Sequence, residues 1–176
     1  MKPIKQKKCK VCKRLFTPFS STSSVCDFEC ALIHSKQVKD KVLRQDTKER
    51  KERLKTNSDY VRELQVIFNK YIRLRDKDKG CVSCGKPLKG KYDAGHYYST
   101  GSYPELRFNE WNVWGQCVYC NQHCHGNLIE YRERLNSLGF SDLLITLDKL
   151  KGVPRKYTIP ELKELKEFYK QKIKNL

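Results

Sequence analysis

The sequence predicts a small α+β protein made of compact cysteine-rich units and charged helices. Only 38% of its 176 residues are hydrophobic and 32% are charged, a composition too poor in apolar residues for one large core. Eight of its nine cysteines fall in two sets of closely spaced pairs, and two such pairs supply the four thiolates of a tetrahedral zinc site. The expected fold is therefore zinc-stapled, with an N-terminal four-cysteine finger, a long charged helix, a second four-cysteine core and C-terminal helices.

Residues 1–35 are expected to form the N-terminal four-cysteine zinc finger. Two residues separate the cysteines of its first pair and three separate those of its second pair, a spacing typical of zinc ribbons and treble clefs. The ligands are Cys9, Cys12, Cys26 and Cys30. Seven Lys/Arg against two Asp/Glu make the segment basic, which favours a polyanionic partner. The DNA-binding candidates here are Lys10, Lys13 and Arg14. The alternative is a purely structural zinc site that contacts no partner.

Residues 36–79 are expected to form a charged helical linker or arm. Its first half alternates positive and negative side chains and has few apolar ones, the pattern of a solvated helix. The cluster at residues 57–59 (Asn-Ser-Asp) is a helix-start signal. After it, Val61, Leu64 and Phe68 keep helical spacing, which indicates a helix that packs against the next domain. The arm could also mediate a homodimer.

Residues 80–138 are expected to form the chemical core. Two Cys-x-x-Cys pairs bracket it, and they should hold a second structural zinc because four thiolates leave no open position; the ligands are Cys81, Cys84, Cys117 and Cys120. Cys124 is left over as a plain thiol. Residues 80–135 carry a net charge of only +1, whereas the flanking segments carry +5, +7 and +4. This division suits an enzyme whose flanks bind a phosphate backbone while a metal neutralises the reacting phosphate.

Residues 139–176 are expected to form a C-terminal helical segment. Residues 141–152 form a short amphipathic stretch. Thr158 and Glu161 then have the form of a capping box with Pro160 in the first turn. These signals predict two helices, the second of which opens at Thr158.

The core also contains residue types that suit phosphodiester hydrolysis. This reaction requires an activated water and neutralisation of charge at the phosphate and at the departing oxygen. A histidine such as His96 suits the base role at neutral pH, and oxygen ligands from Asp and Asn suit Mg²⁺ or Mn²⁺. All of these residue types lie between Asp93 and Asn127.

The order His96, Asn112 and Asn121 within Cys-x-x-Cys brackets resembles the HNH, or ββα-metal, nuclease superfamily. More closely, residues 93–132, DAGHYYSTGSYPELRFNEWNVWGQCVYCNQHCHGNLIEYR, resemble the NinG (Rap) recombination proteins of lambda-like phages. That resemblance implies a ββα-metal, HNH-like core. It also implies a structure-specific DNA endonuclease that nicks branched recombination intermediates such as D-loops and Holliday junctions.

The resemblance also implies a role for each site residue. His96 would be the general base, Asn112 would brace the loop, and Asn121 would be a ligand of the catalytic Mg²⁺ or Mn²⁺. Asp93 would ligate this metal, orient His96 or cap the turn, because Gly95 stands where HNH enzymes often place their metal-binding Asp. Two further residues that could face the metal are His123 and Asn127, whereas His125 points elsewhere. Apart from the resemblance, Arg107 and Arg132 are candidate phosphate clamps, although lone arginines could equally be surface residues.

The expected partners follow from the charge and from the resemblance. They are DNA, branched rather than linear, together with phage or host recombination proteins. No apolar signal segment opens the chain and no run is long enough to span a membrane, so the expected location is the cytoplasm of the bacterial host. The alternative function is a non-catalytic zinc-finger protein that binds DNA junctions or a recombination partner.

Overall fold

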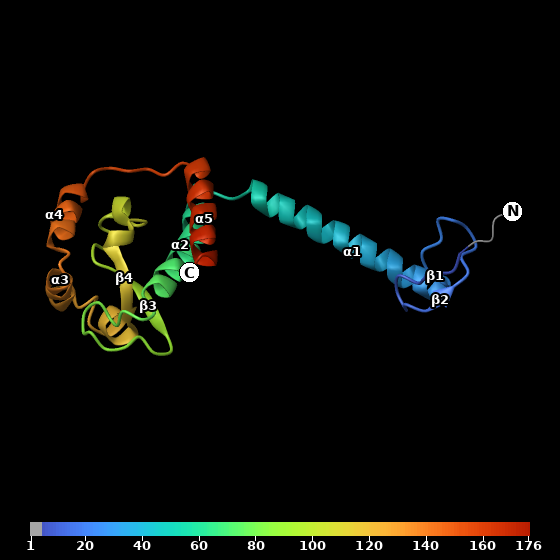
Figure 1. Ribbon diagram of the computed structural model, residues 1–176. Helices are drawn as coiled ribbons and strands as arrows, with labels where there is room; N and C mark the ends of the chain where they lie inside the picture. Colours follow the sequence, from blue (N-terminus) through green and yellow to red (C-terminus); the bar gives the residue numbers. More distant parts are fainter. Residues whose placement is uncertain (1–4) are drawn as a thin grey trace. The chain divides into compact units, whose positions relative to one another are not determined.

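The computed structural model describes residues 5–176. The chain divides into two compact units, the first ending at Lys55 and the second beginning at Thr56 (Figure 1). In the first unit, β1 (Lys7–Lys8) pairs antiparallel with β2 (Leu15–Phe16), and α1 (Phe28–Arg53) follows. The Asp27 carboxylate caps α1 by accepting from the Cys30 N–H at 2.7 Å. The sequence boundary expected at residue 35 therefore lies inside one continuous helix.

The long helix α1 has almost no buried face. Cys30 is its only buried residue, and apolar side chains such as Val42 and Leu43 are each 64% exposed. The regular alternation of charges explains this, because neither face of the helix is apolar enough to pack. The solvated helix expected for the first half of residues 36–79 is therefore observed as far as Arg53.

The second unit is built around an antiparallel hairpin of β3 (Tyr92–His96) and β4 (Val113–Cys117). Before it comes α2 (Asn57–Arg75), which opens with a capping box at Thr56. The short turns η1 (Pro104–Leu106) and η2 (Glu110–Asn112) lie between the strands, and η3 (Tyr119–His123) follows them. The chain ends with α3 (Leu128–Ser137), α4 (Ser141–Leu150) and α5 (Ile159–Lys174).

The two faces of this hairpin pack against different helices. On one face, Ala94 and Val113 join a core with α2 and α5 that includes Phe68 and Tyr169. On the other face, Trp114 packs with residues of α3 and α4; the members contributed by these helices are Tyr131, Leu135 and Leu144. Residues 57–75 thus belong to the core of the second unit, because their apolar stripe covers the sheet.

The observed architecture is a small α+β protein with two two-stranded sheets and several helices. Both cysteine sets expected from the sequence form compact clusters. Within residues 5–176, no helix is long and apolar enough to cross a membrane.

Candidate functional site

The N-terminal cysteine cluster has the dimensions of a zinc site. The four Sγ atoms of Cys9, Cys12, Cys26 and Cys30 all lie within 4.8 Å of one another, and the Cys12 and Cys26 sulfurs are 3.4 Å apart. Sulfurs bound tetrahedrally at about 2.3 Å lie roughly 3.8 Å apart. The donor set therefore fits zinc, and the β1–β2 hairpin and the first turn of α1 hold it together.

The second cysteine cluster joins the base of the β3–β4 hairpin to the loop before it. The four sulfurs of Cys81, Cys84, Cys117 and Cys120 again lie within 4.8 Å, with Cys84 and Cys117 at 3.9 Å. Burial raises the pKa of the Cys81 thiol, but backbone N–H groups nearby outweigh it and set the pKa below its usual value. Such N–H groups favour the thiolate that a metal requires.

Next to this cluster, Asp93 and Asn121 lie side by side. The Asn121 carboxamide is 2.9 Å from Asp93 Oδ2, and the Gln122 carboxamide is 2.7 Å from the same oxygen. Strand β3 presents Asp93 and the turn η3 presents both amides. A half-turn of either amide would present its oxygen instead of its nitrogen, so these side chains offer the oxygen donors that Mg²⁺ or Mn²⁺ prefers. Gln122 was missed in the sequence; its position beside Asn121 is the only signal for it.

Asn112 is completely buried and holds the loop that follows β3. Its Oδ1 accepts from the Tyr98 N–H at 2.8 Å, and its Nδ2 donates to the carbonyls of Tyr98 and Leu106 at 3.0 and 3.1 Å. Its own carbonyl accepts from the Tyr97 N–H. Asn112 thus fixes the backbone immediately after His96.

His96 points away from Asp93. Alternation along β3 places the two residues on opposite faces of the hairpin, and His96 shares its face with Ala94, which packs in the α2 core. Its Nε2 lies 3.1 Å from the Arg107 carbonyl, which can only accept, so Nε2 carries the proton and Nδ1 is the basic nitrogen. Burial lowers the pKa of His96 below its usual 6.5, although the Arg107 carbonyl acts in the opposite direction. Neutral His96 therefore keeps one unprotonated ring nitrogen, but the structure does not bring it together with Asp93 and Asn121.

A steric clash explains why residue 95 is a glycine and not an aspartate. A Cβ at Gly95 would lie 2.0 Å from Oε1 and 2.9 Å from Cβ of Gln116. Gln116 is completely buried, and its Nε2 donates to Ser83 Oγ at 2.7 Å and to the Gly126 carbonyl at 2.6 Å. An aspartate cannot occupy position 95 while Gln116 fills this space.

Other predicted ligands have different surroundings. Asn127 donates from Nδ2 to the Cys120 sulfur at 3.7 Å, so it supports the zinc cluster rather than the Asp93 pair. His123 is exposed, and its ring stands 6.0 Å from that of Tyr119. Cys124 belongs to neither cysteine cluster.

The two predicted phosphate clamps are engaged within the protein. Arg107 donates to the Thr100 carbonyl at 3.1 Å and to Gln65 Oε1 at 3.4 Å. Arg132 donates to the Tyr97 hydroxyl at 2.9 Å and pairs with Asp148 at 3.6 Å. Both side chains therefore have protein partners. In the first unit, the finger residues Lys10, Lys13 and Arg14 are exposed.

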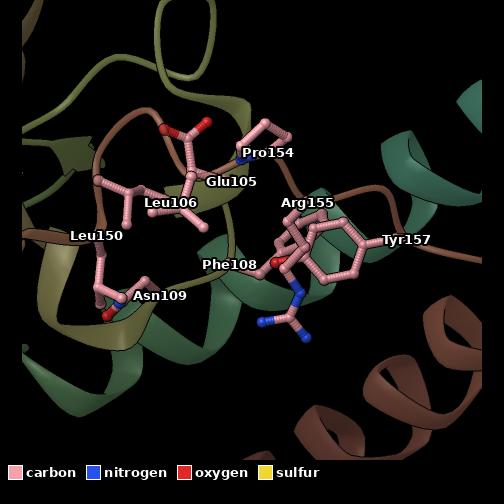
Figure 2. A pocket seen from close by; sticks show the side chains of 9 residues that line it. Glu105, Leu106, Phe108, Asn109, Leu150, Pro154, Arg155 and Tyr157 are labelled. Carbon is pink, nitrogen blue, oxygen red and sulfur yellow. The ribbon is translucent and has the colours of Figure 1, made fainter.

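A hollow of about 350 Å³ lies beside η1 (Figure 2). Leu106 and Phe108 form its apolar wall, and the Arg155 guanidinium stands 4.6 Å from the centre of the Tyr157 ring. It includes none of the residues expected at the active site. The hollow is therefore distinct from the Asp93–Asn121 pair.

Comparison with known proteins identifies the family. The family model described as Bacteriophage Lambda NinG protein matches residues 1–176. Protein ninG of Escherichia phage 933W is 34% identical over 192 residues, which cover 97% of this chain and 94% of that protein. Protein ninG of Escherichia phage lambda is 42% identical over 127 residues, which cover 72% of this chain and 62% of that protein. No solved structure matches the chain. The chain therefore belongs to the NinG family of bacteriophage proteins.

Proposed function

We propose that this protein is a metal-dependent DNA endonuclease of the HNH, or ββα-metal, type that nicks branched recombination intermediates. The observation that carries the proposal is the Asp93–Asn121 pair, held 2.9 Å apart at the base of a hairpin that the second cysteine cluster fastens. A carboxylate and an amide oxygen fit Mg²⁺ or Mn²⁺ and leave other coordination positions open. When bound, such an ion would neutralise charge on the phosphate and on the departing oxygen.

The residues of the chain divide the remaining work. Asp93 and Asn121 would orient the scissile phosphate through the cation, and Gln122 would hold the Asp93 carboxylate in place. His96, neutral and with its Nε2–H on the Arg107 carbonyl, is the proposed acceptor of the proton from the attacking water. Asn112 supports that role by fixing the backbone beside His96.

The test is cleavage of a synthetic four-way DNA junction by the zinc-loaded protein in a series of Mg²⁺ and Mn²⁺ concentrations. Asp93→Ala and Asn121→Ala should abolish cleavage, whereas Asp142→Ala, an exposed carboxylate on α4, should leave it unchanged. His96→Ala should reduce the rate by about 10²-fold or more, the usual contribution of a general base. Cleavage that survives Asp93→Ala would refute the assignment of the metal site.

One observation favours a second candidate, a non-catalytic zinc-finger protein that binds DNA junctions or a recombination partner. It is the placement of His96 on the hairpin face opposite Asp93. Binding of the junction without cleavage at any metal concentration would support this second function. Cutting of linear duplex at a fixed sequence, without preference for branches, would instead indicate a restriction or homing nuclease.

A further inference from the structure

A basic hollow of about 490 Å³ adjoins Asp93, where the end of α2 meets the start of β3. The residues that line it include three basic ones, Lys70, Arg73 and Lys91, together with Asp93. The hollow is therefore positively charged overall and reaches directly to the proposed metal ligand.

The fold fixes the part of α2 from which two of these side chains extend. Lys70 and Arg73 are three residues apart on α2, so they share one helix face. The Tyr92 hydroxyl donates to the Arg73 carbonyl at 2.6 Å, which ties the end of α2 to the strand that carries Asp93. The opposite face of α2 is anchored in the core by Phe68 and Ile72. The fold therefore fixes the backbone of Lys70 and Arg73 relative to the strand that carries Asp93.

These three cations also have no partners within the described part of the protein. Across residues 5–176, no ion pair or hydrogen bond involves the side chains of Lys70, Arg73 or Lys91. By contrast, Arg107 and Arg132 have protein partners. Clustered cations without partners repel one another, and a polyanion relieves that repulsion.

We propose that this hollow binds the sugar–phosphate backbone of DNA and leads one strand to Asp93. The inference rests on the proposed function in one respect, namely that Asp93 belongs to the metal site. The cations come from two parts of the chain, Lys70 and Arg73 from α2 and Lys91 from the segment before β3. Three cations spread over two segments suit the successive phosphates of a nucleic-acid strand better than they suit a single small anion. Asp93 borders this hollow, so a strand bound there would bring one of its phosphates close to the proposed metal ligand.

The test compares two variants of the full-length, zinc-loaded chain that lose the same charge. The first is the triple variant Lys70→Gln/Arg73→Gln/Lys91→Gln. The control replaces exposed lysines elsewhere in the second unit, Lys149→Gln/Lys156→Gln/Lys163→Gln. Binding to a labelled four-way DNA junction is measured by fluorescence anisotropy between about 50 and 200 mM KCl, without added Mg²⁺ or Mn²⁺. Because no cleavage metal is present, the result does not depend on whether the protein is a nuclease.

Loss of three phosphate contacts should make the negative slope of log affinity against log salt shallower by roughly 2.7. The salt-induced loss of affinity over this range should then become roughly fortyfold smaller than for the wild type. The control should keep most of the wild-type slope. As a check that needs no variant, bound junction should protect Lys70 and Lys91 of the wild type from acetylation, read by mass spectrometry.

Equal slopes in the two triple variants, or acetylation of Lys70 and Lys91 that DNA does not change, would overturn the inference. Protection by RNA but not by DNA of the same shape would also overturn it. If the slope and the protection behave as expected while the wild type cuts no junction in Mg²⁺ or Mn²⁺, the binding surface stands and only the proposed nuclease activity fails.

Discussion

Replacing Gly95 with alanine should destabilise the second unit. Gly95 lies in the regular strand β3 and does not have a positive φ angle. The cost of a side chain at this position is therefore steric and not conformational. An added Cβ would meet Gln116 Oε1 at 2.0 Å and the Gln116 Cβ at 2.9 Å. Gln116 is fully buried and cannot move aside without leaving its hydrogen-bond partners.

The expected cost comes from two contributions. Displacement of Gln116 would break its hydrogen bonds to Ser83 Oγ and to the Gly126 carbonyl, at about 1 kcal/mol each. Overpacking of the buried site adds about 1–3 kcal/mol. We therefore expect Gly95→Ala to lower the free energy of unfolding by about 3–5 kcal/mol. Gly95→Asp should cost more, because it would also bury a carboxylate.

Urea unfolding followed by tryptophan fluorescence measures this, because both tryptophans, Trp111 and Trp114, lie in the second unit. Gly101→Ala is the matched control, since a Cβ there meets nothing within 4 Å. A Gln116→Ala background removes the contact with Oε1 but keeps the contact with Cβ at 2.9 Å, so the cost of Gly95→Ala should fall there without vanishing. Equal stability of Gly95→Ala and Gly101→Ala would contradict the steric explanation, as would an unchanged cost in the Gln116→Ala background.

Three further outcomes follow from the structure. Cys84→Ser should reduce the zinc content from two ions per chain to one, measured by elemental mass spectrometry; a content that stays at two would exclude the assigned ligands. Asp76→Asn should lower the unfolding free energy by about 3–5 kcal/mol, because Asp76 is 1% exposed and pairs with Arg75 at 2.6 Å; circular dichroism in urea measures this loss, and a cost below about 1 kcal/mol would contradict it. Burial lowers the pKa of His96 below 6.5, so the unfolded chain takes up that proton first and stability should fall as the pH drops below about 6.5. Thermal unfolding between about pH 7.5 and pH 5 should show this slope, and His96→Gln should flatten it.

Local signals in the sequence were sufficient to predict several of the helices and the two cysteine clusters. Cys-x-x-Cys spacing determines which sulfurs can meet on one ion, because a short knuckle brings two sulfurs to the same point. The apolar spacing of Val61, Leu64 and Phe68 likewise indicated the buried face of α2, two of whose residues, Leu64 and Phe68, are fully buried. The expected segment boundaries at residues 35 and 79 differ from the division at residue 55, since only packing shows that α2 covers the sheet.

The arrangement of the site depended on contacts between residues distant in sequence. The residue types alone grouped His96 with Asp93 and Asn121, but the period-two alternation of β3 separates His96 from that pair. The sequence offered Arg107 and Arg132 as candidate phosphate contacts, and the structure adds that both also bond to carbonyl, hydroxyl or carboxylate groups of the protein. Charge counting cannot show such engagement, because it requires knowing which groups come within hydrogen-bonding distance.

The sequence by itself determined two cysteine clusters, a charged solvated helix and membership of the NinG family, because spacing, charge pattern and motif order are local properties of the chain. Only the tertiary structure decided that Gly95 must lack a side chain, that Asp93 has Asn121 and Gln122 as neighbours, and that Lys70, Arg73 and Lys91 form one hollow beside it. These features depend on which side chain fills which space once the hairpin and its covering helices have packed together.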